Sequence, residues 1–354
     1  QAGITQHIEN FKAQGHRVFQ HPQHLATATH QGTFVPPTLI ELNHIGELQR
    51  EVFGPVLHLV RYARNDLDQL LDQINATGYG LTQGVHTRID ETIARVVNRA
   101  HAGNVYVNRN MVGAVVGVQP FGGEGLSGTG PKAGGPLYLL RLLSQRPADA
   151  LARTFADADR TTPPEEAVRE RLLAPLATLQ QWAQIQGNAA LANTCQQFAQ
   201  QTQSGTARTL PGPTGERNVY TLAPRARVLC LAPSADDLLV QTAAVLASGG
   251  TALWPNAQAS LHAQLPTQVQ AQVTLHNNAL GNAAVALDAV LHHGDASALQ
   301  AVCTALAQRP GPIVGVTTLQ PGATDIPLER LLIERALSVN TAAAGGNASL
   351  MTIG

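Results

Sequence analysis

Hydrophobic and polar positions follow two alternating periods along the first 145 residues. Ile4, Ile8 and Phe11 recur at the spacing of one helical face. Residues 56–63 are instead a short run rich in Val and Leu, as expected of a strand. Further helix and strand patterns follow in turn. Residues 1–145 are therefore predicted to form a mixed or parallel sheet covered by helices.

A more regular alternation begins at Arg227. Apolar runs bounded by Gly, Pro and polar residues predict strands, and helical spacing fills the segments between them. This repeated alternation predicts a Rossmann-like, doubly wound parallel sheet, which gives the chain an α/β fold. The expected strands are 227–232, 250–255, 271–276, 287–293 and 312–319, with one helix expected over 260–270.

A polar, proline-punctuated stretch separates these two regions. Two helical patterns and an extended segment marked by Gly and Pro follow it, so residues 146–225 are interpreted as a helical linker and an extended arm. The last residues are rich in small side chains and show no amphipathic period. The predicted parts are therefore an α/β part over 1–145, the linker and arm over 146–225, the Rossmann-like domain over 226–335 and a tail over 336–354.

Composition narrows the class of protein. With 354 residues, of which 44% are hydrophobic and 13% charged, the chain is long enough for two domains and is not disordered. A net charge of −1 and an aromatic content of 4% argue against a nucleic-acid surface and against an anionic-membrane surface. No apolar stretch reaches the ~18 residues of a membrane span.

The numbers and spacing of the cysteines and histidines argue against a disulfide framework and against a metal site. Cys195, Cys230 and Cys303 form no C-x-x-C pair, which indicates a reducing cytoplasm, and each is interpreted as a buried structural residue. The thirteen histidines are irregularly spaced and include no H-E-x-x-H motif. His292 and His293, adjacent on a predicted strand, should point to opposite faces. We expect no metal.

The glycine-dense segment 113–136 is the most unusual stretch of the chain. Its residues 123–128 satisfy G-x-G-x-x-G, but the prolines and glycines that follow leave no helix to bind a pyrophosphate. The hypothesis of an independent nucleotide-binding protein rests only on this match. Ser127 and Lys132 have no positioned base beside them in the sequence pattern, so both are interpreted as structural.

Two motifs in a fixed order identify a resemblance. "EVFGPV" over 51–56, followed by "QPFGGEGLSGTG" over 119–130, resembles the aldehyde dehydrogenase superfamily. "GAVVGVQPFGG" with "GTGPKAGGP" resembles the branch that oxidises glutamate γ-semialdehyde, the open form of 1-pyrroline-5-carboxylate. The C-terminal half is similar to bifunctional enzymes that join a proline dehydrogenase to this aldehyde dehydrogenase. The resemblance implies the C-terminal part of an aldehyde dehydrogenase catalytic domain, followed by a Rossmann-like domain and a tail.

The resemblance implies a role for five residues. Glu51 would accept hydrogen bonds from the nicotinamide-ribose hydroxyls of NAD, and Phe53 would pack beside the nicotinamide. Gly113 and Ala114 would bind the α-carboxylate of a small-molecule substrate through their backbone N–H groups. Phe121 would form a wall of the aldehyde channel. NAD is the cofactor implied for this part, and FAD is implied only for the upstream proline dehydrogenase domain.

The chain lacks the catalytic cysteine and glutamate of the family pattern. The family's nucleophilic cysteine, in a G-Q-x-C context, and its general-base glutamate would lie upstream of Gln1, so no catalytic residue is assigned here. The chain begins inside a helical pattern without a methionine, which we interpret as part of a longer polypeptide that is inactive in isolation. Its expected partners are the upstream aldehyde dehydrogenase and proline dehydrogenase domains and further copies in a homo-oligomer. This part should bind no nucleic acid.

A second hypothesis makes the chain a non-catalytic assembly or lid module of the same multidomain enzyme. Residues 146–354 contain no reactive constellation, and the tail has a Gly345–Gly346 hinge and an apolar end. Such a tail would cover a passage between active sites. The resemblance places the complete polypeptide in the cytoplasm, with any peripheral contact to the inner membrane made by other domains.

Overall fold

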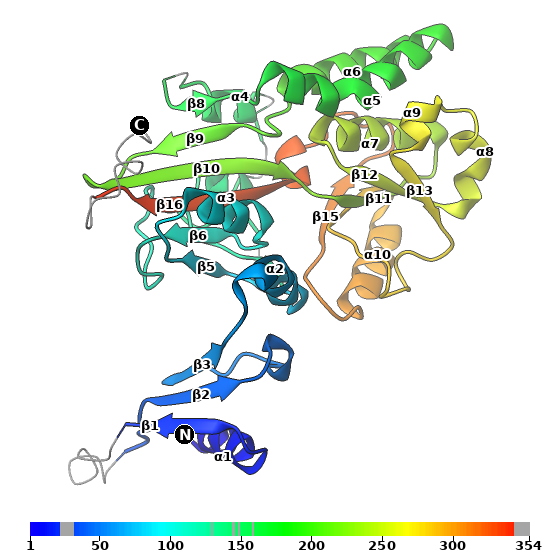
Figure 1. Cartoon of the computed structure of the whole chain (residues 1–354). Helices are drawn as coiled ribbons and strands as arrows, with labels where there is room; N and C mark the ends of the chain where they lie inside the picture. The colour runs from blue at the N-terminus through cyan, green and yellow to red at the C-terminus, as the bar shows by residue number, and fades with distance from the viewer. Residues whose placement is uncertain (22–31, 129, 144–145, 148, 158, 343–354) are drawn as a thin grey trace. The chain divides into compact units, whose positions relative to one another are not determined.

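A computed structural model describes residues 1–21, 32–128, 130–143, 146–147, 149–157 and 159–342. The chain divides into two compact units (Figure 1). Unit 1 comprises Gln1–Tyr79 with Asn98–Ala100, and unit 2 comprises Gly80–Val97 with the chain from His101 onward. Among the described residues, no helix is long and apolar enough to cross a membrane.

Unit 1 is a helix packed on a small sheet. The predicted apolar face of the first helix is confirmed, since Ile8 and Phe11 are buried against Ile40 and Leu42, and Ile4 packs beside them. Strand β2 lies between β1, to which it is antiparallel, and β3, to which it is parallel. The elements are α1 (Ala2–Ala13), β1 (Arg17–Gln20), β2 (Thr38–Leu42), η1 (Ile45–Glu47), β3 (Val56–Val60), η2 (Arg64–Asp66) and α2 (Leu67–Ala76).

Unit 2 contains a six-stranded mixed sheet with the order β5-β6-β16-β10-β9-β8. Helix α3 (Asp90–Arg99) connects β5 to β6, which pair in parallel. The long strands β10 and β16 run antiparallel through the middle of this sheet (Figure 1). Its strands are β5 (Thr82–Val85), β6 (Asn104–Val107), β8 (Thr161–Thr162), β9 (Ala207–Leu210), β10 (Glu216–Pro224) and β16 (Leu332–Asn340), and a separate pair is formed by β4 (Tyr79–Gly80) and β7 (Glu124–Gly125).

The structure differs from the sequence analysis at the start of the expected tail. Residues 336–340 are the second half of β16, which pairs with β10 on one side and with β6 on the other. Leu337 and Val339 alternate with Ser338 and Asn340, but this pattern is too short to predict a nine-residue strand by itself. The backbone ladders on both sides supply the stabilisation that the side-chain pattern does not reveal. Residues 343–354, with the Gly345–Gly346 hinge, lie outside the described residues.

The Rossmann-like prediction is confirmed by a second, wholly parallel sheet in unit 2. Its order, β13-β12-β11-β14-β15, reverses direction between β11 and β14, as in doubly wound folds. The predicted helix over 260–270 is instead two short helices, because Pro266 has no N–H to continue the first one and caps the second. The elements are β11 (Arg227–Leu231), α7 (Ala235–Ser248), β12 (Thr251–Pro255), η4 (Asn256–Gln258), α8 (Ala259–His262), α9 (Thr267–Gln270), β13 (Val273–His276), β14 (Ala289–His293), α10 (Ala296–Ala307), β15 (Gly315–Leu319) and η5 (Leu328–Leu331).

The helical patterns of the linker form a packed pair. Helices α5 (Glu166–Ile185) and α6 (Ala189–Gln201) contact each other and α7. The Asn188 side chain caps α6 by accepting a hydrogen bond from the Leu191 N–H. The same region also holds the 3-10 turn η3 (Tyr138–Arg141) and the short helix α4 (Ala150–Thr154).

The cysteines do not all have the expected environment. Cys195 on α6 and Cys230 on β11 are fully buried, but Cys303 on α10 is exposed, which corrects the interpretation of a third buried thiol. The buried residue of α10 is Val302. The next position along a helix lies about 100° further round, and this rotation turns Cys303 away from the core.

Candidate functional site

The first motif lies on an exposed segment of unit 1 that leads into β3. Glu51 is exposed, and Phe53 exposes 91% of its surface. Gly54 has φ +156°, and a Cβ there would lie 2.5 Å from Cδ1 of Ile4, so a side chain at this position would force the Ile4 side chain to shift. The Thr38 N–H donates to the Pro55 carbonyl at 2.9 Å and fixes the end of the segment. The sequence thus presents a carboxylate and an aromatic ring to solvent from a fixed backbone.

The anchor loop, residues 111–119 of unit 2, follows β6 through a tight turn at Asn108. Asn108 adopts φ +55°, and its side chain pairs with both backbone groups of Thr87. Gly113 and Ala114 are exposed, and a Cβ at Gly113 would meet nothing within 4 Å. Within the described part of the chain, neither of their N–H groups donates a hydrogen bond. These two amides are therefore available to an anion.

The far end of the anchor loop is fixed by Gln119, a residue that the sequence analysis did not select. Its Oε1 accepts the Val115 N–H at 3.0 Å, and its Nε2 donates to the Glu216 carboxylate at the start of β10. Glu216 also accepts hydrogen bonds from Arg109 and, at 3.0 Å, from Asn218. Arg109 donates in addition to Ser338 of β16 at 2.8 Å. One carboxylate therefore ties the anchor loop to β10 and, through Arg109, to β16.

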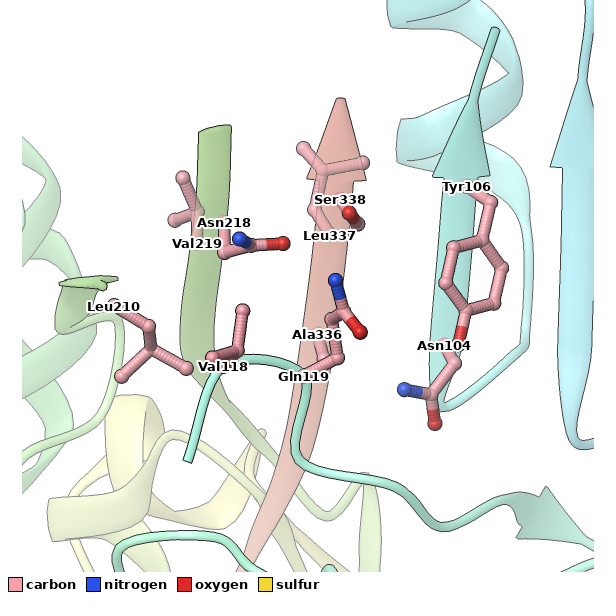
Figure 2. A pocket seen from close by; sticks show the side chains of 10 residues that line it. All are labelled: Asn104, Tyr106, Val118, Gln119, Leu210, Asn218, Val219, Ala336, Leu337 and Ser338. Carbon is pink, nitrogen blue, oxygen red and sulfur yellow. The ribbon is translucent and has the colours of Figure 1, made fainter. Parts of the chain in front are cut away.

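Figure 2 shows where Gln119 lies. Its amide stands over β16, with Asn218 of β10 on one side and Asn104 and Tyr106 of β6 on the other. The Arg109 guanidinium carbon also lies over the Tyr106 ring, 5.2 Å from the ring centre. The sequence analysis did not predict this junction: Gln119 lies within the second motif, but Glu216 is 97 residues further on and lies in none of the quoted motifs, so no local pattern pairs the two.

Phe121 is held at the start of the second motif by a small β-bridge. Its N–H donates to the Ala133 carbonyl at 3.0 Å, and the Ala133 N–H donates back at 2.8 Å. The described residues between them turn rather than forming a helix, because Ser127 and Gly128 donate to Glu124 and Gly125 in successive turns. The prediction that no helix follows the glycine fingerprint is therefore confirmed.

The edge of the Rossmann-like sheet where a dinucleotide would bind is filled by the chain's own side chains. Asp237, in the first turn of α7, is buried and accepts hydrogen bonds from Ser234 Oγ at 2.8 Å and from the Gly322 N–H at 2.9 Å. His293 Nε2 lies 3.8 Å from the same carboxylate. Since a carboxylate already occupies the positive end of α7, this edge is poorly suited to a phosphate.

None of the described thiols lies on the two motifs. Burial raises the pKa of the Cys195 thiol to about 12 and also raises the pKa of Cys230, which makes both poor nucleophiles. Cys303 is on α10, in the Rossmann-like part. Across the residues that the structure describes, no three His, Cys, Asp or Glu side chains are grouped to hold a metal ion.

The comparisons with known proteins match the same family that the two motifs resemble. Residues 1–146 match the aldehyde dehydrogenase family. All five candidate residues, Glu51, Phe53, Gly113, Ala114 and Phe121, lie within the matched range. The chain is also 43% identical over 118 residues to "1-pyrroline-5-carboxylate dehydrogenase" of Staphylococcus aureus, covering 33% of this chain and 23% of that protein.

The similarity extends beyond the matched range. Over 358 residues the chain is 58% identical to "Bifunctional protein PutA" of Salmonella typhimurium, covering 100% of this chain. The chain spans only 27% of the length of that relative. A solved structure of proline utilization A from Corynebacterium freiburgense superimposes with a TM-score of 0.59 at 21% identity, over 92% of this chain and 29% of that one. This last likeness shows the fold alone, which is the α/β fold expected from the sequence.

Proposed function

We propose that this chain is the C-terminal part of a longer bifunctional enzyme of proline catabolism. In this proposal it supplies cofactor-binding and substrate-binding residues to an NAD-dependent enzyme that oxidises glutamate γ-semialdehyde to glutamate. The observation that carries the proposal is the pair of exposed, unpaired amides at Gly113 and Ala114, on a loop fixed by Asn108 at one end and Gln119 at the other. The relatives named for proline utilisation and for 1-pyrroline-5-carboxylate oxidation support the substrate class.

The residues of unit 1 have the chemistry that NAD requires. An exposed carboxylate at Glu51 can accept hydrogen bonds from both vicinal hydroxyls of a ribose. Phe53, almost wholly exposed, would cover apolar surface by packing against the nicotinamide side of the cofactor. When bound, NAD would accept the hydride that leaves the substrate carbon. No other residue of this chain is assigned to that step.

The residues of unit 2 would hold the aldehyde. The Gly113 and Ala114 N–H groups would bind its α-carboxylate, which fixes the far end of the molecule and orients the aldehyde carbon. Phe121 would line the path of the aldehyde and exclude water from it. The thiol nucleophile and the general base would come from the preceding part of the longer polypeptide, since the buried thiols of Cys195 and Cys230 are unsuited to the role.

The test compares the complete polypeptide with the isolated chain by following NADH formation from glutamate γ-semialdehyde. The complete polypeptide should be active and the isolated chain inactive. In the complete polypeptide, Glu51→Gln should raise KM for NAD by about tenfold or more, the loss expected for a charge-assisted hydrogen bond, and leave KM for the aldehyde unchanged. Glu170→Gln, on the exposed side of α5, is the matched control. A complete polypeptide that does not reduce NAD with this aldehyde would refute the proposal.

A further inference from the structure

Lys132 is the feature of unit 2 that the proposed function does not use. It is one of only two lysines in a chain with 23 basic Lys and Arg residues, and it is 2% exposed. Burying an ammonium group is costly unless hydrogen bonds and opposite charges compensate for the lost water. The partners of Lys132 therefore indicate what the residue is for.

The ammonium group is paired with the backbone next to Phe121. Nζ of Lys132 donates to the Gly122 carbonyl and, at 3.1 Å, to Oδ1 of Asn104 at the start of β6. The same Asn104 oxygen accepts the Gly122 N–H at 3.1 Å, and Asn104 Nδ2 donates to the Pro120 carbonyl at 2.8 Å. Lys132 and Asn104 together thus hold the residues on both sides of Phe121.

The backbone of Phe121 itself is bound to the neighbour of Lys132. Both hydrogen bonds of the bridge between Phe121 and Ala133, at 3.0 and 2.8 Å, depend on where residue 133 lies. Residue 132 is fixed in turn from the other side, since its N–H donates to Oε2 of Glu334 on β16 at 3.0 Å. The Lys132 backbone and side chain therefore fix the segment from two directions.

The sequence leaves room for this arrangement with a glycine. A Cβ at Gly103 would lie 2.7 Å from Nζ of Lys132 and 1.9 Å from the Gly122 carbonyl oxygen. Any side chain at position 103 would therefore displace the ammonium group or the loop. An ammonium is compact, whereas a guanidinium is a wide planar fork. The site thus explains a lysine in a chain that otherwise relies on arginine.

Nearby carboxylates favour the charged form of the buried Lys132 amine. Burial lowers the pKa of Lys132 to about 8, while Glu334 and Glu124 oppose that change and Arg335 adds to it. Tyr220 donates to the other oxygen of Glu334 at 2.7 Å. At neutral pH the group is therefore mainly an ammonium, with a full set of protons to donate.

We propose that Lys132 is a positioning residue: its ammonium group holds the backbone on either side of Phe121 and so fixes that ring as a wall of the aldehyde channel. The claim that Phe121 lines an aldehyde channel rests on the proposed function. The fixing of the segment itself does not depend on the reaction and can be measured separately.

The kinetic test uses Lys132→Met in the complete polypeptide, with Lys12→Met on the exposed face of α1 as the matched control. Lys132→Met should raise KM for the aldehyde by about tenfold, change kcat less, and leave KM for NAD unchanged. Phe121→Ala should do the same. If Lys132 acts through Phe121, the double variant should be no worse than Phe121→Ala alone. Unchanged aldehyde KM, or fully additive effects, would overturn the proposal.

A second measurement does not depend on activity. Hydrogen–deuterium exchange of the peptide covering residues 118–134 should be at least about tenfold faster in Lys132→Met, with the exchange of β11 unchanged. Unaltered exchange of that peptide would overturn the positioning role. If exchange is faster but no polypeptide oxidises the aldehyde, the proposed function fails while the positioning role stands. If Lys132→Met does not fold, Lys132→Gln, which keeps one donor for Gly122, replaces it in both measurements.

Discussion

At the scale of single residues, two exposed amides and one exposed aromatic ring carry most of the proposed chemistry. Gly113, Ala114 and Phe53 could be selected from the sequence because family motifs surround them, and the structure leaves all three exposed. The roles of Gln119, Asn104 and Glu216 could not be predicted in this way, although Gln119 lies inside the second motif. Their importance comes from hydrogen bonds between residues far apart in the chain, and no local pattern encodes such a pairing.

Removing one amide of the anchor loop tests the carboxylate-binding role. Ala114→Pro in the complete polypeptide deletes one N–H, so KM for glutamate γ-semialdehyde should rise by about tenfold, the loss expected for a hydrogen bond to a charged group. The matched control is a second aldehyde that lacks the carboxylate. Butyraldehyde has no α-carboxylate, so its kcat/KM should be unaffected by the substitution. Equal losses for both aldehydes would mean that the loop has been distorted instead.

At the scale of elements, the Glu216 junction joins the anchor loop to β10. Glu216→Ala should destabilise unit 2 by about 2 kcal/mol, because Arg109 and Gln119 lose the charged partner of their hydrogen bonds. Urea denaturation measures this free energy of unfolding. Arg109→Ala should cost a similar amount, and the double variant clearly less than the sum of the two. Strictly additive losses would show that the two side chains are not coupled.

The position of β16 predicts the effect of truncation. A chain ending at residue 331 lacks the strand between β6 and β10, so the six-stranded sheet would separate into two exposed edges. We expect that chain to aggregate or to lose cooperative unfolding. A chain ending at residue 342 should stay soluble and unfold cooperatively. Light scattering and thermal unfolding distinguish the two. A soluble, cooperatively folded chain ending at 331 would show that β16 is dispensable.

The elements also show how far the sequence patterns reach. The five parallel strands of the Rossmann-like part lie in short stretches rich in apolar residues, and all five were predicted within a few residues. The six-stranded sheet was not predicted as a unit, since it is assembled from four separated stretches of the chain. Periodicity reports which residues face a core, but it does not report which strand lies beside which.

At the scale of the whole chain, two histidines make stability depend on pH. Nε2 of His7 and Nε2 of His58 are 2.8 Å apart in unit 1, so one ring must donate and the other accept, which two charged rings cannot do. Burial lowers the pKa of both rings, with Arg50 adding to the effect at His7 and His7 adding to it at His58.

The sign of the pH effect follows from the lowered pKa values. Just below the ordinary pKa of 6.5 the unfolded chain binds more protons at these sites than the folded one. The contribution to stability is therefore complete above that pH and is lost as the pH falls through the lowered pKa values. Urea denaturation at about pH 7.5 and about pH 5 should show a larger loss for the wild-type chain than for His58→Gln. Equal losses would contradict the prediction.

β16 lies between β6 and β10 in the sheet but is synthesised after both of them. Ala336 pairs with Asn104, so β6 leaves the ribosome more than two hundred residues before its neighbour does. Until then the facing edges of β6 and β10 have no partner, and unpaired edges are sites at which nascent chains associate wrongly. The parallel sheet of β11 to β15 has no such delay, because all its strands precede residue 320. Biogenesis of this protein should therefore depend on chaperones for the six-stranded sheet rather than for the Rossmann-like part.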